Sequence, residues 1–399
     1  MKVAGIIAEY NPFHSGHAYH ISETRKQADA VVCVLSGAFT QRGVPSIVSK
    51  WARAEMAVKS GVDLVLELPF PFSAAPAELF AFGGVDLLDK TGIVDVLSFG
   101  SESGELEPLV ITATILEEKG REISEAVKKR AGEGYSYAAE VARVVGEMES
   151  GNVMDSPNNL LGIKYIMAIN RLKSGIKPVT VKREGGYNSL SLEGEYASAA
   201  AIRKALKEGN FEKIRAFMPE SSLEILQREQ AAGRLYNISN LDLLFTGLLR
   251  REENLADIAY VAEGVENRFR KAAETCCTVE SIINFVKTKR YTHTRLSRIC
   301  AQMLVGVNKT TLDENMCGGV AYARVLAASK KGTVLIREMK EKGRVPVISR
   351  GGDYVNMSSY AKKQFELEMK AGNICALCVE KTTERRANTD LLISPYIGE

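Results

Sequence analysis

Three of the chain's four histidines, His14, His17 and His20, lie in one short stretch, E-Y-N-P-F-H-S-G-H-A-Y-H, at residues 9–20. The stretch follows the first hydrophobic run. Pro12 and Gly16 interrupt the backbone before a helix that we expect to start near His17. The amino end of a helix attracts anionic phosphate, and two imidazoles there can donate hydrogen bonds to a departing pyrophosphate. The pattern predicts a nucleotide site formed by His14 and His17, although one or two of these histidines could instead cap the helix.

Alternating strands and helices must position this stretch. Short apolar runs predict strands at residues 2–8, 30–35, 63–68, 94–99 and 178–183, and amphipathic patterns predict helices at 17–28, 50–60, 75–90 and 159–172. Continuous apolar strands that alternate with helices indicate an α/β fold with a Rossmann-like parallel sheet covered on both faces. Such sheets bind ligands at the carboxyl ends of their strands. The sequence contains neither G-x-G-x-x-G after the first strand nor G-x-x-x-x-G-K-[ST] anywhere. The candidate phosphate site is therefore the loop of residues 9–17, here called the histidine loop.

The second half of the chain reads differently. Helical patterns dominate from about residue 218 to 340, and residues 344–399 predict a small mixed element. We therefore expect an α/β domain with the nucleotide site at residues 1–217, which the family resemblance given below implies to be catalytic and ATP-binding, and a mainly helical domain at 218–399. Residues 287–298, K-T-K-R-Y-T-H-T-R-L-S-R, contain five cations and no acidic residue. They predict a surface that follows RNA phosphates and stacks a base, with a solvated basic helix face as the alternative. The residues expected to contact RNA are Lys287, Lys289, Arg290, Tyr291, Arg295 and Arg298.

Composition limits the possible partners and compartments. The 399 residues are 45% hydrophobic and 25% charged, with a net charge of +3, so nucleic-acid affinity must come from local patches. No run is apolar enough for a signal sequence or a membrane span, and we expect a soluble, cytoplasmic protein without a membrane partner. Seven scattered cysteines indicate a reducing compartment, and Cys375 and Cys378 are expected to be structural thiols rather than a metal site.

A second motif supports the nucleotide site. Residues 197–203 read A-S-A-A-A-I-R, where Ser198 can cap a helix that carries Arg203 one turn further on. Together with the histidine loop, this stretch resembles the paired H-x-G-H and I-S-S-T-x-I-R motifs of the nucleotidyltransferase superfamily, whose members transfer or form adenylates at an ATP α-phosphate. Ala200 stands where the motif often has a hydroxyl residue. The missing hydroxyl would weaken the binding of phosphate by this motif.

Longer segments narrow the resemblance. G-I-I-A-E-Y-N-P-F-H-S-G-H-A-Y-H-I, the stretch from residue 35 to 69, F-G-S-E-S, S-P-N-N-L-L-G-I-K-Y-I-M-A-I and K-R-Y-T-H-T-R-L-S-R-I follow one another in order. They resemble the tRNA(Met) cytidine acetate ligase family. The resemblance implies activation of acetate by ATP to acetyl-adenylate, then acetylation of the wobble cytidine of elongator tRNA(Met) to 4-acetylcytidine, with release of pyrophosphate and AMP. ATP and Mg²⁺ are the implied cofactors. The alternative is a small-molecule adenylyltransferase that makes a dinucleotide or a coenzyme precursor.

The resemblance and the strand-end positions together define the expected site. Gly100 would let the backbone pass beside the adenine or ribose, and Ser101 would donate to it. The family implies ATP contacts from Asn159 and Arg183. Acetate needs cations and donors beside the triphosphate, which Gln41, Arg42, Lys50 and Arg53 can offer. The expected catalytic residues are His14, His17 and Lys50. The expected ATP site comprises Ile7, Ala8, Glu9, Tyr10, Asn11, Pro12, Phe13, His14, Ser15, Gly16, His17, His20, Gly100, Ser101, Asn159, Arg183, Ser198 and Arg203.

Overall fold

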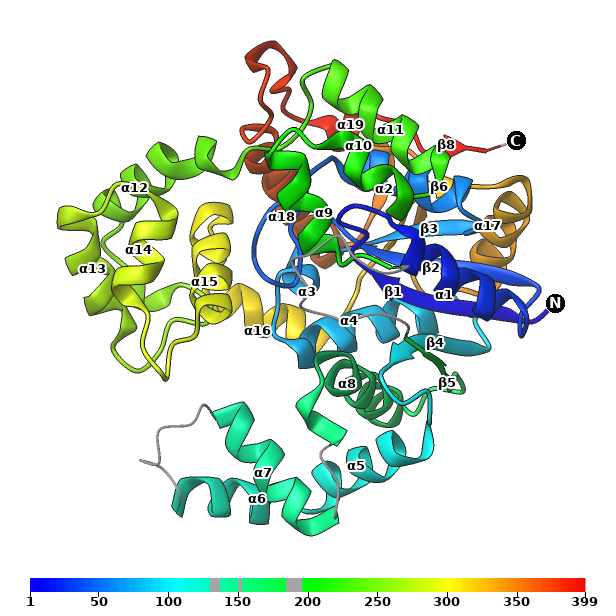
Figure 1. The fold of residues 1–399 in the computed structure, drawn as a ribbon, viewed down its shortest axis with the longest axis horizontal. Helices are drawn as coiled ribbons and strands as arrows, with labels where there is room; N and C mark the ends of the chain where they lie inside the picture. The colour runs from blue at the N-terminus through cyan, green and yellow to red at the C-terminus, as the bar shows by residue number, and fades with distance from the viewer. Residues whose placement is uncertain (130–136, 150–152, 184–195, 399) are drawn as a thin grey trace.

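The computed structural model describes residues 1–129, 137–149, 153–183 and 196–398, and within them one sheet of eight strands forms the centre of the molecule (Figure 1). Its order is β5-β4-β1-β2-β3-β6-β7, with β8 beside β6. The strands are β1 (Val3–Ala8), β2 (Ala30–Ser36), β3 (Leu64–Leu68), β4 (Val96–Ser101), β5 (Lys177–Lys182), β6 (Ala323–Ala328), β7 (Val347–Ile348) and β8 (Tyr396–Ile397). The first five are the predicted strands, and each pairs in parallel with its neighbour, which confirms the α/β fold class.

Helices connect and cover these strands. In the first half they are α1 (Ser15–Arg25), α2 (Lys50–Lys59), α3 (Phe70–Ser73), α4 (Ala77–Lys90), α5 (Glu107–Glu118), α6 (Gly120–Lys129), α7 (Tyr137–Glu149), α8 (Pro157–Leu172) and α9 (Ala199–Lys207). In the second half they are α10 (Phe211–Ile214), α11 (Glu220–Ala231), α12 (Asp242–Arg251), α13 (Val265–Thr275), α14 (Val279–Val286), α15 (His293–Val305), α16 (Lys309–Gly318), α17 (Lys330–Lys342), α18 (Ser359–Ala376) and α19 (Thr389–Leu392). Short 3₁₀ turns are η1 (Val153–Asp155), η2 (Arg215–Phe217), η3 (Ile238–Leu241), η4 (Leu255–Asp257), η5 (Gly351–Asn356) and η6 (Thr382–Glu384).

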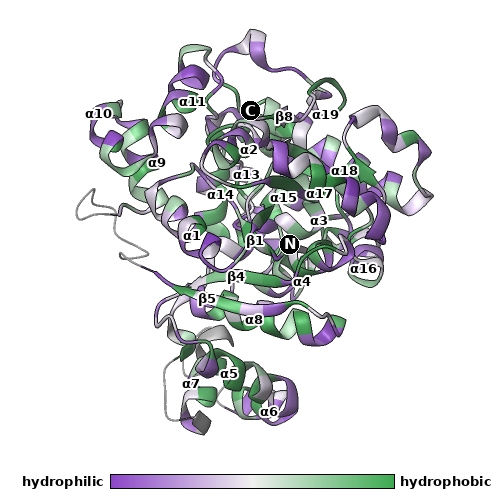
Figure 2. Ribbon diagram, turned by 90° about the vertical axis from the view of Figure 1, so that its right-hand side faces the viewer, coloured by the Kyte–Doolittle hydropathy of each residue, from purple (hydrophilic) through white to green (hydrophobic). Residues whose placement is uncertain are grey.

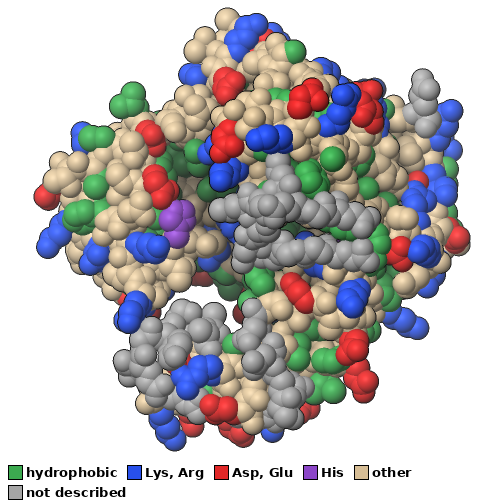
Figure 3. All heavy atoms as spheres, viewed as in Figure 1, with side chains coloured by type: hydrophobic (Ala, Val, Ile, Leu, Met, Phe, Trp, Pro, Cys, Tyr) green, Lys and Arg blue, Asp and Glu red, His purple; other side chains and the backbone are tan. Residues whose placement is uncertain are grey.

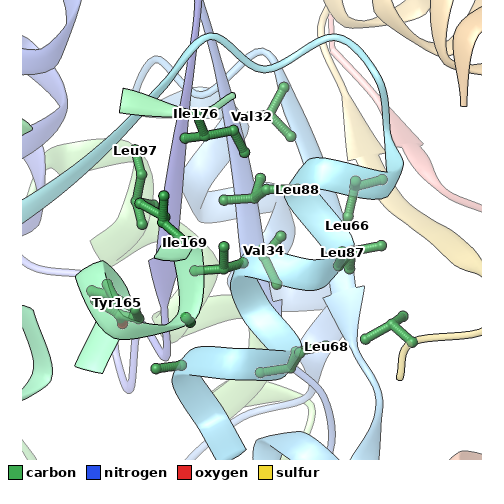
Figure 4. Packing of buried hydrophobic residues seen from close by; sticks show 14 of the residues in the cluster. Val32, Val34, Leu66, Leu68, Leu87, Leu88, Leu97, Tyr165, Ile169 and Ile176 are labelled. Atoms are coloured by element: carbon green, nitrogen blue, oxygen red, sulfur yellow. The ribbon is translucent and has the colours of Figure 1, made fainter. Parts of the chain in front are cut away.

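The central strands are mainly apolar because both of their faces are buried. In β2, Val32 and Val34 pack with α4 and α8 on one face, whereas Val31 and Leu35 belong to the cluster on the other face, with α2 and α9. This alternation follows from the two-residue repeat of a strand. Figure 4 shows the first cluster in close-up, and Figure 2 shows the apolar strands running through the middle of the molecule. A sheet buried in this way holds the loops at its strand ends in fixed positions.

The chain after residue 320 returns to the sheet, which the sequence did not predict. β6 pairs with β3 in the antiparallel direction, and β7 and β8 pair with β6 in parallel. Strands of one sheet therefore lie on both sides of the expected boundary between residues 217 and 218, and that division stays a prediction. Between them, α12, α13, α14 and α15 form a helical lobe with its own apolar core. The segment α5–α7, inserted between β4 and β5, lies at the edge of the molecule (Figure 1).

Two further expectations concern cysteines and membranes. All seven cysteines lie within the described residues and are free, and both Cys375 and Cys378 are buried, as expected of structural thiols. No helix among the described residues is long and apolar enough to cross a membrane.

Candidate active site

A cavity of about 800 Å³ lies at the carboxyl ends of the parallel strands. Ala8 and Glu9 reach it from the end of β1, residues 40–42 and 44–47 from the loop after β2, Gly100 from the end of β4 and Arg183 from just beyond β5. These segments meet because the carboxyl ends of parallel strands lie along one edge of the sheet. Twelve of the residues expected to bind ATP line this cavity: Ile7, Ala8, Glu9, Tyr10, Asn11, His14, His17, His20, Gly100, Arg183, Ser198 and Arg203.

His14 and His17 cap helix α1 and also line the cavity. The Nδ1 atom of His14 accepts a hydrogen bond from the Gly16 N–H at 3.1 Å, and Nδ1 of His17 accepts one from the His14 N–H at 3.2 Å. The two rings stack, with centroids 3.7 Å apart. A neutral imidazole whose Nδ1 accepts a hydrogen bond carries its proton on Nε2. Each ring can therefore donate from Nε2, the geometry that an anionic phosphate needs.

Burial and neighbouring cations keep all three histidines neutral. Burial lowers the pKa of His14 to about 3, with a further contribution from Arg183 and Arg203. Burial lowers the pKa of His17 well below its ordinary value, and it lowers that of His20 to about 4. The protein groups of this site are short of negative charge, since desolvated imidazoles lie beside guanidinium groups. A triphosphate would supply that charge.

Two glycines make room for these side chains. A Cβ on Gly16 would lie 3.0 Å from Cε1 of His14, so glycine lets the ring fold back over the helix start. A Cβ on Gly100 would lie 2.9 Å from Cγ of Arg183, so this glycine admits the arginine at the cavity wall. We expected Gly100 to let the backbone pass beside the ligand and Gly16 to interrupt the backbone before the helix. The structure shows that each one makes room for a side chain of the site.

Helix α9 supplies a second cationic wall. Ser198 caps it, accepting a hydrogen bond from the Ala201 N–H at 3.1 Å, as expected. One turn on, Nη1 of Arg203 donates to the Asn11 carbonyl at 2.7 Å and so joins α9 to the histidine loop. Ala200 also lines the cavity, so a methyl group faces it where the motif often has a hydroxyl. Sequence reasoning missed two further lining cations, Lys204 and Lys207, although their helical spacing from Ala200 could have indicated them.

Several expected ATP residues lie behind the cavity wall. Phe13 is fully buried in the core, and Pro12, Ser15 and Gly16 shape the loop and the start of α1 without lining the cavity. Ser101 is also fully buried: its hydroxyl accepts hydrogen bonds from the Gly104 N–H and from the Thr180 hydroxyl. Ser101 therefore holds the turn after β4 and is not placed to donate to a nucleotide.

Asn158, rather than Asn159, lines the cavity. The Asn159 side chain accepts a hydrogen bond from the Glu102 N–H at 3.0 Å and donates one to the Val153 carbonyl at 3.1 Å. Both ends of its amide thus stabilise the junction between β4 and α8. The Asn158 amide donates to Oε1 of Glu102 at 2.6 Å. Neither asparagine caps α8, whose N-cap is Ser156, and the sequence does not tell which of the two lines the cavity.

Lys50, expected to be catalytic, lies outside the cavity lining in a buried ion cluster. Its Nζ is 3.1 Å from Glu368 Oε1 and 2.6 Å from Asp390 Oδ1, and it also contacts Glu67. Burial alone would lower the pKa of Lys50, but these three carboxylates raise it. This placement indicates a structural cation. Arg53 is likewise buried and donates to the Glu9 carbonyl at 2.6 Å, whereas Gln41 and Arg42 do line the cavity.

The basic segment of residues 287–298 belongs to the helical lobe. Figure 3 shows Lys and Arg side chains on this lobe, beside a hollow that separates it from the segment α5–α7. Glu263 reduces the positive charge of the segment, because its Oε2 is 2.9 Å from Arg290 Nε and 3.8 Å from Arg295 Nη1. Tyr291 is only 5% exposed, and its hydroxyl donates to the Ala262 carbonyl at 3.0 Å. The expected base stacking on Tyr291 is therefore not available, since the ring packs in the core of the lobe.

Among the described residues, no group of three or more His, Cys, Asp or Glu side chains is arranged so that it could hold a metal ion. The carboxylates of the described cavity lining are Glu9 and Glu380. Oε1 of Glu9 accepts a hydrogen bond from the Gln41 N–H at 2.8 Å.

Comparison with known proteins agrees with this geometry. Residues 1–390 match the model of the HIGH Nucleotidyl Transferase family. A tRNA(Met) cytidine acetate ligase of Caldanaerobacter subterraneus subsp. tengcongensis is 39% identical over 94% of this chain and 95% of its own. One of Acetivibrio thermocellus is 39% identical over 98% of both chains. The crystal structure of Thermotoga maritima TmcAL bound with alpha-thio ATP superposes with a TM-score of 0.93 at 32% identity over the whole of both chains. The chain belongs to the HIGH nucleotidyl transferases and, among them, to the tRNA(Met) cytidine acetate ligase family.

Proposed function

We propose that this chain is an ATP-dependent ligase that activates acetate as acetyl-adenylate and acetylates the wobble cytidine of elongator tRNA(Met) to 4-acetylcytidine. The observation that carries the proposal is the pair of neutral imidazoles, His14 and His17, at the start of α1 in a cavity that also presents Arg183 and Arg203. The names of the relatives and the ATP analogue named in the T. maritima structure support it. A tRNA substrate implies a cytoplasmic reaction.

The first step is an in-line displacement at phosphorus. An acetate oxygen forms a bond to the α-phosphorus, the bond from that phosphorus to the bridging oxygen breaks, and pyrophosphate leaves. Positioning and charge stabilisation account for most catalysis of this kind. The Nε2–H groups of His14 and His17 would donate to phosphate oxygens, and Arg183 would balance their charge. No covalent bond to the protein is needed.

The second step uses the adenylate as an activated acyl donor. The exocyclic amine of cytidine attacks the acetyl carbonyl carbon, the bond from that carbon to the phosphate oxygen breaks, AMP leaves and the amine loses one proton. This step mainly requires the base to be held against the adenylate. The cations of the helical lobe, Lys287, Lys289, Arg290, Arg295 and Arg298, would hold the RNA backbone.

Mg²⁺ would enter with the triphosphate. The ion usually keeps several waters and is held by one or two carboxylates together with substrate phosphates. Glu9 is the lining carboxylate that lies next to His14 and His17. A Mg²⁺ ion that arrives bound to the triphosphate needs only one or two protein carboxylates, so this lining is sufficient for it. When bound, the ion would neutralise part of the phosphate charge.

A small-molecule adenylyltransferase is not favoured, because the compared relatives are named as tRNA ligases and because such an enzyme would need no basic helical lobe. Exchange of labelled pyrophosphate into ATP separates the two functions. The proposal expects exchange that depends on acetate, followed by 4-acetylcytidine in tRNA(Met) digests examined by mass spectrometry. Exchange driven by a mononucleotide and not by acetate would overturn it.

Substitution His17→Ala tests the site itself. It removes one Nε2–H donor, and loss of a single charge-stabilising donor typically costs about 100- to 1,000-fold in rate. We expect acetate-dependent exchange to fall by that amount while the Kd for tRNA changes little. Because the Nδ1 atom of His17 also caps α1, circular dichroism should confirm that the variant is folded. A collapse of tRNA affinity in a folded variant would contradict the separation of the ATP site from the RNA surface.

A further inference from the structure

A second, smaller cavity of about 240 Å³ lies next to the first one. It is bounded by the loop after β2 and by helices α12, α14 and α15 of the helical lobe. Val44, Pro45 and Ile238 line both cavities. Pockets for drug-sized ligands measure about 300–1,000 Å³, so this one suits a single ring system.

A tight loop forms the wall between the two cavities. The Thr40 N–H donates to the Val44 carbonyl at 2.9 Å, and the Gly43 N–H donates to the Thr40 carbonyl at 2.8 Å. Thr40 and Arg42 line the large cavity, whereas Gly43 lines the small one. The two cavities are therefore separated by the thickness of one hydrogen-bonded loop.

Helix α15 holds this loop from the other side. Gly43 has φ +73°, and a Cβ there would lie 2.6 Å from the Arg298 Cα, so the loop backbone packs directly on α15. Nη1 of Arg298 is 3.5 Å from the Gln41 carbonyl, and the Ser297 hydroxyl is 3.4 Å from the Gly43 carbonyl. The basic segment thus borders the small cavity and contacts the wall of the large one.

The lining of the small cavity combines apolar walls with hydrogen-bonding groups. Nε2 of His293 lies 3.2 Å from Oε2 of Glu280, and their side chains are 43% and 67% exposed. Asp242 and Ser239 add a carboxylate and a hydroxyl. The apolar walls include Phe39, Pro45, Ile238, Ile283 and Leu304. Proteins that read single-stranded RNA stack base faces on aromatic rings, His included, or on Arg guanidinium planes, and contact base edges with polar groups; Phe39 and His293 are the rings of this lining.

We propose that the small cavity holds the nucleobase adjacent to the acetylated cytidine, an inference that rests on the proposed function. The reacting cytosine itself must enter the large cavity, because His14, His17 and Arg183 line that cavity and not the small one. A neighbouring base in an unstacked loop can lie one loop thickness away. The basic segment, residues 287–298, borders the small cavity, and its cations would bind the RNA phosphate that joins the two nucleotides. The site would then select the RNA by the base next to its target.

The experiment is a cycle that combines protein variants with altered RNA. An anticodon stem-loop is made intact, or with an abasic residue immediately 5′ or 3′ of the target cytidine. The protein variants are His293→Ala and Glu280→Gln, with Glu274→Gln as an exposed control on the same lobe that does not line the cavity. The readouts are kcat/KM for acetylation of the RNA and acetate-dependent pyrophosphate exchange, which needs no RNA.

The proposal expects an abasic neighbour to lower kcat/KM of the natural chain by about 5- to 150-fold, the range for loss of one stacked base. In His293→Ala or Glu280→Gln the intact RNA should react more slowly, and the abasic substitution should cost less than in the natural chain. Exchange should be retained in both variants, and Glu274→Gln should behave as the natural chain does.

Three results would overturn the proposal. Equal rates on the intact and both abasic RNAs would show that no neighbouring base is bound. The same fold-loss from the abasic residue in the natural chain and in both variants would place that base elsewhere. Loss of exchange in both variants would assign the cavity to the activation step. Absence of acetate-dependent exchange in the natural chain is a different result, because it refutes the proposed function itself.

Discussion

Substitution Lys50→Met would separate a structural role for this lysine from a catalytic one. Lys50 joins the start of α2 to Glu67 on β3, Glu368 on α18 and Asp390 on α19, and its side chain is 4% exposed. Two of these carboxylates come from the last 32 residues of the chain. Lys50 is therefore the cation that fastens the C-terminal helices to the sheet.

The size of the expected loss of stability follows from the burial of the Lys50 ion cluster. Removal of one partner from a buried ion cluster leaves uncompensated charge and typically costs about 3–5 kcal/mol. Glu368 also accepts hydrogen bonds from the Ala38 N–H at 3.2 Å and the Phe70 N–H at 2.7 Å, so a rearranged carboxylate would disturb the loop after β2. Since folded proteins are stable by about 5–15 kcal/mol, we expect a large fraction of the unfolding free energy to be lost.

The assay is urea unfolding of the natural chain and the variant at pH 5.5 and pH 8. Without Lys50, burial and mutual repulsion would raise the pKa of each carboxyl above its value in the unfolded chain. A group with a raised folded pKa supports folding at low pH and opposes it as pH rises. The destabilisation should therefore be larger at pH 8 than at pH 5.5. The control is Lys59→Met, whose partly exposed pair with Glu55 at 3.5 Å should contribute at most about 1 kcal/mol.

One result would refute the structural reasoning. Suppose that the free energy of unfolding of Lys50→Met is within about 1 kcal/mol of that of the natural chain, and that the variant nevertheless loses acetate-dependent pyrophosphate exchange. Lys50 then acts in catalysis, as the sequence predicted. A variant that is destabilised, and that regains exchange at low temperature where it is folded, agrees with a structural cation.

Further predictions concern the cavity and the basic segment. Gly100→Ala places a methyl group 2.9 Å from Arg183 Cγ and should raise KM for ATP several-fold in the exchange assay; an unchanged KM would mean that the arginine does not contact nucleotide. Because the pKa of His14 is lowered to about 3, the ligand-free chain should lose up to about 1.4 kcal/mol per pH unit from this group as pH falls below about 6.5. Chemical unfolding of His14→Gln between pH 6.5 and 5 should show a smaller loss, and equal slopes would contradict the assignment. Glu263→Gln frees Arg290 and should steepen the salt dependence of tRNA binding, measured by filter retention; an unchanged slope would place that arginine off the RNA.

Most of the sheet could be predicted from the sequence because β1–β4 are buried on both faces and so consist mainly of apolar residues. β6 was not predicted, whereas β3 was predicted despite its fully buried Glu67; β6 contains Arg324, a fully buried arginine whose Nη2 donates to the Asp390 carbonyl at 3.0 Å. A charged residue inside an apolar run normally argues against a central strand. Here its hydrogen bond to a residue 66 positions later in the chain makes the burial possible, and no local pattern reveals such a partner.

The site shows the same difference between features that local patterns predict and features that depend on distant partners. His14 and His17 could be predicted because type, spacing and a following helix are local properties of one stretch. Lys50 could not be placed, since its partners Glu368 and Asp390 are more than 300 residues away in the sequence. Tyr291 was misplaced for a related reason, because the carbonyl that its hydroxyl contacts lies 29 residues earlier. Sequence identifies groups that can do chemistry, whereas long-range partners decide which of them remain free to do it.

In the proposed mechanism, capping and phosphate binding are two uses of the same two side chains, His14 and His17, although the sequence presents them as alternatives. Each imidazole has two nitrogens, and the helix start uses Nδ1 of both His14 and His17 as acceptors for backbone N–H groups. Capping therefore fixes the tautomer, so that the nitrogen left for the cavity is a donor. Burial keeps both rings neutral, so the nitrogen that each presents to the cavity acts by hydrogen-bond donation. As negative charge builds up on the leaving pyrophosphate it would raise both pKa values, and the same two donors would bind it more strongly in the transition state than in the ground state.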